Sequence, residues 1–174
     1  ITTFFVNKIL KRPLLFRKHF DKIETFKPLI VLENNESIIN IGIDFNCREY
    51  CIIRVFGKGE IQIGNSVFFN SFTTINCFEK IVIGDNTIIG EGVKIYDHNH
   101  VYNRGEKLII EKNKFNTSPV IIGKNCWIGS NVTILKGVTI GDNVIIGAGC
   151  LIYKSIPSNT IIKLNQNLTI ENLV

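Results

Sequence analysis

The amino-acid sequence predicts an all-β fold, a parallel β-helix in which short strands alternate with corners. The main observation is a six-residue repeat in residues 122–157, where isoleucine opens every hexad: Ile122, Ile128, Ile134, Ile140, Ile146 and Ile152. Four positions later, each hexad has a small or β-branched apolar residue. An α-helix repeats its apolar positions every 3.6 residues, so a strict period of six indicates the hexapeptide repeats of a β-helix.

A second observation is a longer period in the residue that follows each isoleucine. It is glycine in two hexads and a larger residue in the third, as in Gly123, Gly129 and Leu135. We therefore expect three hexads to form one triangular coil of eighteen residues, with glycine permitting the tight corners. Successive coils should stack about 4.8 Å apart, so that the isoleucines form a continuous core.

The first 37 residues predict an N-terminal capping segment. Apolar residues in 1–27 recur at helical spacing, and Pro13 separates two short helices. Residues 1–30 hold seven basic and two acidic residues, whereas the rest of the chain is neutral. The segment therefore either covers the open end of the coil or rests, as a basic amphipathic segment, on an anionic membrane surface.

The β-helix domain is expected to span residues 38–157. The first clear hexad opens at Ile63, and its coil has two extra residues before the next one opens at Ile83. After His100 the hexads stop, and residues 101–119 predict a loop that leaves one corner. Long loops inside a compact domain are often functional. Residues 158–174 predict a last strand and a tail.

Composition limits the classes of function. At 174 residues the chain predicts a single domain, and it has no run of eighteen apolar residues. Two of its five cysteines, Cys126 and Cys150, occupy inward positions of the repeat, which favours a cytoplasmic protein without disulfides, peripheral to the inner face of the membrane if the N-terminal segment binds there. The coil is neutral and has no nucleic-acid-binding motif, so we expect no nucleic acid partner.

The best candidates for chemistry are the residues Asp97, His98 and His100, in the run D-H-N-H at the exit to the loop. Histidine titrates near neutral pH and can take a proton from a hydroxyl group, and an acceptor such as Asp97 can fix its tautomer. The only close cysteine pair, Cys47 and Cys51, lacks two further zinc ligands, so we expect no metal.

The hexads, the D-H-N-H run, the loop and the run I-G-K-N-C-W-I-G-S-N-V-T together resemble the hexapeptide-repeat acyltransferases over about residues 60–157. The resemblance is strongest to sugar O-acetyltransferases, namely the galactoside, maltose, capsule and exopolysaccharide enzymes. It implies a left-handed β-helix, acetyl-CoA as the donor, a hydroxyl of a sugar or surface-polysaccharide precursor as the acceptor, and a homotrimer with active sites between subunits.

The resemblance also implies roles for single residues. His100 matches the catalytic histidine, His98 ranks second, and Asn70, thirty residues before His100, matches an acceptor-binding asparagine. Loop residues such as Tyr102 and Arg104 are expected to contact the acceptor.

For the donor, Trp127 matches a tryptophan that lines the acetyl site, and Gly129 and Ser130 match the turn whose serine N–H lies near the thioester oxygen. Gly147, Ala148 and Lys154 match positions along the CoA channel. The usual final turn is replaced by I-I-K-L-N-Q-N, where Lys163 is expected to supply the basic residue.

Three alternatives remain at this stage. The first is N-acetylation of an amino sugar. The second is a γ-type carbonic anhydrase on the same coil, which needs three histidines on zinc, whereas only His98 and His100 lie near the coil. The third is a non-catalytic scaffold, which would not need D-H-N-H and an interrupting loop.

Overall fold

A computed structural model describes residues 26–165. The helices predicted for the N-terminal segment and most of the predicted C-terminal tail lie outside these residues. Across the described part of the chain, the structure has no helix long and apolar enough to span a membrane.

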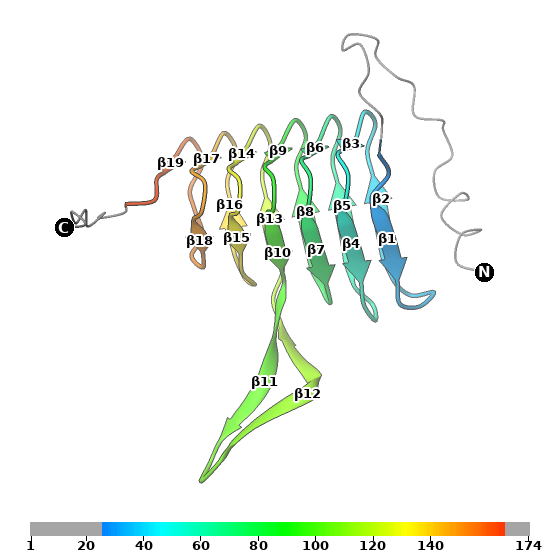
Figure 1. Ribbon diagram of the computed structural model, residues 1–174, viewed down its shortest axis with the longest axis vertical. Helices are drawn as coiled ribbons and strands as arrows, with labels where there is room; N and C mark the ends of the chain where they lie inside the picture. The colour runs from blue at the N-terminus through cyan, green and yellow to red at the C-terminus, as the bar shows by residue number, and fades with distance from the viewer. Residues whose placement is uncertain (1–25, 166–174) are drawn as a thin grey trace, which may run out of the picture.

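The described residues form a β-solenoid with three parallel sheets and a projecting antiparallel hairpin (Figure 1). The first sheet contains β1 (Leu29–Leu32), β4 (Ile52–Val55), β7 (Thr74–Cys77), β10 (Lys94–Tyr96), β15 (Thr133–Ile134) and β18 (Leu151–Ile152). The second sheet contains β2 (Ile38–Ile41), β5 (Glu60–Ile63), β8 (Lys80–Ile83), β13 (Val120–Ile122) and β16 (Thr139–Ile140). The third sheet contains β3 (Asn46–Cys47), β6 (Phe68–Phe69), β9 (Ile88–Ile89), β14 (Trp127–Ile128), β17 (Ile145–Ile146) and β19 (Ile161–Ile162).

The chain visits the three sheets in turn, so the corners of successive coils stack into three edges. We call the edge between the first and second sheets the hairpin edge. The edge between the second and third sheets is the polar edge, and the edge between the third and first sheets is the glycine edge. The first strand, β1, already lies within the range 1–37 that the sequence assigns to a cap.

The strand register confirms the predicted repeat. Ile63 pairs with Ile83, which accounts for the two extra residues of that coil, and Ile122 pairs with Ile140 across a regular coil of eighteen residues. All six isoleucines that open the hexads of 122–157 are buried, with exposed fractions of 5% or less. They pack with valine, cysteine and phenylalanine side chains into one core along the solenoid.

The glycines after the isoleucines have a different purpose from the one expected. A Cβ added to Gly84 would lie 2.6 Å from the backbone of Gly123 in the next coil, so these glycines permit close stacking of corners. The left-handed backbone of the polar edge occurs at Asn86, Asn125, Asn143 and Asn159, with φ of 55–61°. Asparagine tolerates this conformation better than most residues.

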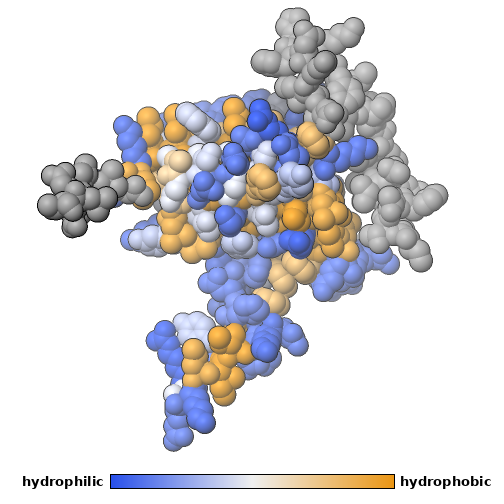
Figure 2. Space-filling view, viewed as in Figure 1, coloured by the Kyte–Doolittle hydropathy of each residue, from blue (hydrophilic) through white to orange (hydrophobic). Residues whose placement is uncertain are grey.

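The hairpin replaces the loop predicted for residues 101–119. It consists of β11 (His98–Arg104) and β12 (Leu108–Thr117), which pair antiparallel with a register shift between His100 and Val101. Pairing between the two strands satisfies backbone groups that cannot join the triangular core. Figure 2 shows that the hairpin projects from the body of the solenoid and that hydrophobic side chains gather on it.

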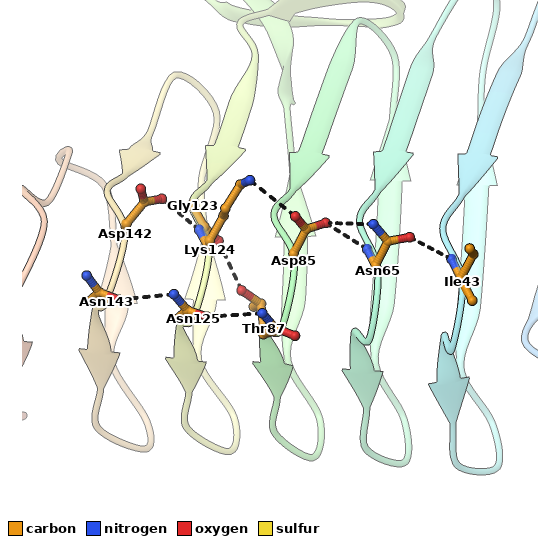
Figure 3. A network of polar contacts seen from close by, with 10 residues as sticks. Ile43, Asn65, Asp85, Thr87, Gly123, Lys124, Asn125, Asp142 and Asn143 are labelled. Atoms are coloured by element: carbon orange, nitrogen blue, oxygen red, sulfur yellow. Dashed lines mark hydrogen bonds and ion pairs between the residues drawn. The ribbon is translucent and has the colours of Figure 1, made fainter. Parts of the chain in front are cut away.

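The polar edge is held by hydrogen bonds that repeat from coil to coil (Figure 3). The Asn65 Oδ1 atom accepts from the N–H of Ile43 at 2.9 Å, and the Asp85 carboxylate accepts from the N–H of Asn65 at 2.8 Å. One coil further, Asn125 Nδ2 donates to Asn143 Oδ1 at 3.2 Å. Each corner therefore fixes the position of the corner beside it.

Candidate active site

Asp97 anchors the hairpin edge at the point where β10 ends. Its side chain is fully buried, and its carboxylate accepts the N–H groups of Phe78 at 2.9 Å, Glu79 at 2.7 Å and Lys80 at 3.0 Å. Burial acts to raise the pKa of Asp97. Hydrogen bonds from His98 and from the N–H groups of Glu79 and Phe78 outweigh that effect, so the pKa lies below its usual value. The residue is therefore a buried carboxylate anion at neutral pH.

His98 is oriented by this carboxylate. Its Nδ1 atom lies 3.2 Å from Asp97 Oδ1, and its side chain is 15% exposed. A proton on Nδ1 can be donated to the carboxylate, which leaves Nε2 as an acceptor. The ring also packs against Phe78, with centroids 4.2 Å apart, and meets Phe115 edge-on at 5.4 Å. His98 is thus fixed in position, and the carboxylate favours a proton on its Nδ1 atom.

His100 lies two residues further along β11 and is exposed. Its ring packs on Phe115 with centroids 4.7 Å apart. Together with Tyr102, Arg104, Leu108 and Ile110, it lines an open groove of about 430 Å³ on the hairpin. Three residues predicted from the sequence, His100, Tyr102 and Arg104, therefore line one concave surface, which has both a potential base and hydrogen-bonding groups.

Most of the residues predicted to contact the donor lie on the glycine edge, which the first and third sheets share. Gly129 donates its N–H to Ile146 O at 2.8 Å, and Gly147 donates to Ile162 O at 2.8 Å, so their corners are stacked. A Cβ added to Gly129 would lie 2.7 Å from the N atom of Ala148. The same row also contains Asn70, Ser130 and Lys163.

Within the described residues, the backbone N–H of Ser130 donates no hydrogen bond, so it can serve an oxyanion. Ala148 and Lys163 are exposed. Trp127 lies in β14, the strand that leads to Ser130, on the outer face of the third sheet, and is 55% exposed. The structure therefore groups the predicted donor residues along one edge, with Trp127 on the adjoining face.

Lys154 is separated from that group. It follows β18 at the hairpin edge, and its Nζ atom lies 5.6 Å from the centre of the neighbouring Tyr153 ring. Because the two edges are different corners of the solenoid, one chain does not bring Lys154 to Ala148, nor His100 to Ser130.

The sequence did not identify Phe78 and Phe115 as site residues. Phe78 lies between Phe56, at 4.4 Å, and Phe115, at 4.1 Å, and its ring forms one wall around His98. The sequence did contain an indication for Phe78. This residue lies where its coil is two residues longer than the repeat, at the corner that stacks against the corner of Asp97. Phe115 lies in the interruption, where no repeat indicates which residue meets the histidines.

No three His, Cys, Asp or Glu side chains come together as metal ligands within residues 26–165. The five cysteines, all of which lie in this range, are free and buried.

Comparison with known proteins agrees with this architecture. A family model for the bacterial transferase hexapeptide (six repeats) matches residues 119–154. WbbJ of Escherichia coli strain K12, a candidate lipopolysaccharide biosynthesis O-acetyl transferase, is 34% identical over 134 residues, which cover 74% of this chain and 68% of WbbJ. The chain belongs to the hexapeptide-repeat acetyltransferase family.

Solved structures share the fold. The hexapeptide-repeat containing acetyltransferase VCA0836 from Vibrio cholerae is 26% identical, with a TM-score of 0.54 over 72% of this chain, and the chain spans 64% of that structure. A second structure of VCA0836 contains acetyl coenzyme A. AntD from Bacillus cereus, an N-acyltransferase, is 21% identical, with a TM-score of 0.60 over 76% of each chain. AntD is similar in fold alone.

Proposed function

We propose that the protein transfers the acetyl group of acetyl-CoA to a hydroxyl group of a sugar or surface-polysaccharide precursor. The observation that supports this best is the position of an exposed histidine, His100, in an open groove that also holds Tyr102 and Arg104, two residues along β11 from the Asp97–His98 pair. The likeness to WbbJ supports a polysaccharide precursor as the acceptor.

His100 is the proposed general base. It removes the proton from the acceptor hydroxyl, the resulting alkoxide attacks the thioester carbonyl, and the CoA thiolate leaves and is protonated. His98 is the proposed positioning residue, because it is largely buried between aromatic rings and is held by Asp97. The free N–H of Ser130 is proposed to stabilise the oxyanion, a contact worth about 3 kcal/mol in other acyl-transfer enzymes.

The glycine edge is the proposed donor channel. Gly147 and the exposed Ala148 leave room for the pantetheine arm, and Lys163 lies on the same edge to meet a CoA phosphate. An Ala148→Trp variant should raise the KM for acetyl-CoA about tenfold or more, which corresponds to about 1.4 kcal/mol. Circular dichroism and the melting temperature check that the coil stays folded. An unchanged KM would remove Ala148 from the channel.

The active site is proposed to form between chains of a homotrimer, because each chain separates its base from its donor row. The outer face of the third sheet supports this assembly. Its outward residues Ile88, Trp127, Ile145 and Ile161 follow one register and are 37–60% exposed. An apolar row of this kind is typical of an interface, and a closed symmetric assembly can bury it in every copy.

Complementation tests the shared site. His100→Ala chains are expected to be almost inactive, and Ala148→Trp chains are expected to be slow at acetyl-CoA concentrations well below their raised KM. At such concentrations mixed trimers, refolded together, should exceed both parents in activity, because some interfaces join two intact halves. Light scattering reports the mass of each sample. Mixed trimers without regained activity would contradict a site shared between chains, and a monomeric wild type would contradict the trimer.

The reaction itself is tested by release of free thiol from acetyl-CoA in the presence of a panel of sugars and nucleotide sugars. The product then separates the two kinds of acyl transfer, because hydroxylamine cleaves an ester readily and leaves an amide intact. We expect a hydroxylamine-sensitive product. A stable amide would favour the N-acetyltransferase alternative, and the absence of thiol release with the whole panel would contradict the proposed activity.

Left-handed winding and a cytoplasmic location are also part of this proposal. The location is supported by the five free thiols, which suit a reducing compartment. Contact of residues 1–27 with a membrane surface stays a prediction from their basic charge.

A further inference from the structure

Two aromatic residues stand out on the glycine edge, at the N-terminal end of the solenoid. Tyr50 and Phe72 occupy the same position in successive coils, and their rings stack with centroids 5.1 Å apart and an interplanar angle of 12°. Both are exposed, by 69% and 53% respectively. Stacking between them therefore fixes two large rings at the surface without burying either.

The backbone at these positions is unfavourable for such residues. Tyr50 and Phe72 have φ of 62° and 63°, in the left-handed region. Later coils fill the same position with Gly92, Asn131 and Gly149, the residue types that tolerate this region. A bulky residue there costs on the order of 1–2 kcal/mol. The scaffold does not require aromatic residues at this corner, so their presence needs another reason.

Two polar residues that can bond a sugar share this corner with the pair. Arg48, which is exposed, lies two residues before Tyr50, and Asn70 lies two residues before Phe72, so the two polar residues are stacked as the rings are. Asn70 Oδ1 accepts the N–H of Ser71 at 2.9 Å. Its Nδ2 group has no partner among the described residues, and the next residue in the aromatic row, Gly92, has no side chain.

We propose that Tyr50 and Phe72 form a platform that binds a pyranose ring of the acceptor. A pyranose has an apolar C–H face, which can stack on an aromatic ring, and a rim of hydroxyl groups, which can bond Arg48 and Asn70. This inference rests on the proposed function, and it assigns the acceptor specificity to two residues outside the hairpin groove.

Substitution by asparagine separates binding from folding. Tyr50→Asn and Phe72→Asn remove the rings but introduce a residue type that the same row already uses at Asn131, so the melting temperature should stay equal or rise. Tyr50→Phe and Phe72→Tyr are the matched controls, because they keep the platform.

The probe is a set of methyl hexopyranosides with gluco- and galacto-oligosaccharides of two to four units, studied by saturation-transfer NMR with the full chain in the absence of acetyl-CoA. Wild type and the aromatic controls should bind at least one of these saccharides through its C–H protons. The asparagine variants should bind it about tenfold more weakly, or not at all. In thiol-release assays they should raise the KM for the saccharide, with kcat and the KM for acetyl-CoA unchanged.

Several outcomes would overturn the platform. They are no binding of any saccharide by the wild type, equal binding by the asparagine variants, or a change in oligomeric mass on substitution, which would mean that the rings contact another copy of the chain. Failure of the proposed reaction is a separate result, because it would appear as absent thiol release whatever the saccharides bind.

Discussion

The polar edge and the hairpin edge are corners of the same solenoid, yet they are stabilised in opposite ways. At the polar edge, stacked asparagines repeat the same hydrogen bond, as from Asn86 to Asn125 at 3.2 Å and from Asn143 to Asn159 at 3.0 Å. At the hairpin edge, one carboxylate, that of Asp97, holds three backbone N–H groups and a histidine. The first edge repeats one kind of polar contact over several coils, and the second places four contacts on the single residue Asp97.

This difference separates scaffold from candidate chemistry. A repeated contact lets each coil position the next, as expected for a solenoid whose coils contact only their neighbours. A single buried carboxylate instead orients one particular side chain, His98, at the base of the hairpin. We therefore expect substitutions at the hairpin edge to have large and specific effects, and those at the polar edge to have small ones.

The largest effect is expected from His100→Ala. Loss of a positioned general base typically lowers the rate about 10²–10⁴-fold. Because His100 lines the groove and its side chain makes no hydrogen bond or ion pair within residues 26–165, the melting temperature should change little. The measurement is kcat for thiol release from acetyl-CoA with the best acceptor of the panel.

His98→Ala is the matched control for the role of the base. It should lower kcat less than His100→Ala does, because we assign His98 to positioning. A histidine that acts as general base is expected to make kcat rise with pH, and this rise should persist in His98→Ala but flatten in His100→Ala. A dead His98→Ala enzyme beside an active His100→Ala enzyme would exchange the two roles and leave the transferase activity intact.

The second effect is on stability, through Asp97→Asn. An asparagine keeps the shape but removes the charge that accepts the N–H groups of Phe78, Glu79 and Lys80. Hydrogen bonds to a charged group are worth about 1.5–3 kcal/mol, so the free energy of unfolding should fall by about 2–3 kcal/mol. Chemical denaturation at neutral pH measures the loss.

The same variant has a defined pH signature. Since folding lowers the pKa of Asp97, the unfolded chain takes up the proton first as the pH falls. The contribution of Asp97 is therefore complete above the ordinary aspartate pKa of about 3.9 and is lost as the pH falls from there through the lower folded value. The difference between wild type and Asp97→Asn should shrink over that acidic window. A constant difference would contradict the assignment.

Much of the fold could be predicted because the repeat is physically redundant. Each isoleucine of the hexads packs into the core at the same position of its strand. The period and the register therefore follow from the sequence, even in the longer coil between Ile63 and Ile83. The hairpin could not be predicted in detail, because strands β11 and β12 pair only with each other and show no repeat. The purpose of the glycines was also misassigned, because contact between coils is not visible in one coil.

The candidate site was predictable only in its parts. D-H-N-H marked the histidines, and the repeat placed Ser130 and Ala148 at corners. Which of those corners share an edge depends on following the chain through all three sheets. The sequence therefore did not show that Lys154, which the resemblance places along the same CoA channel as Ala148, lies on a different edge of the chain. Of the two residues proposed as a platform, Phe72 lies in the first coil with a clear hexad, whereas Tyr50 lies in the irregular coil before it, so the repeat did not align their corners.

The smallest expected effect tests the polar edge, through Asn125. This residue has φ of 55° and bonds the asparagines on both sides through its exposed amide. Asn125→Ala removes the amide and puts alanine, whose side chain cannot form a hydrogen bond, in the left-handed region. The free energy of unfolding should therefore fall by about 1 kcal/mol. Asn125→Gly loses the same amide but tolerates the backbone, so it should cost about half as much. Chemical denaturation of the two variants separates the contribution of the amide hydrogen bonds from that of the backbone conformation. If both variants lower the free energy of unfolding equally, the ladder of amides stabilises this edge. If Asn125→Gly does not lower it, the backbone conformation alone accounts for the asparagines.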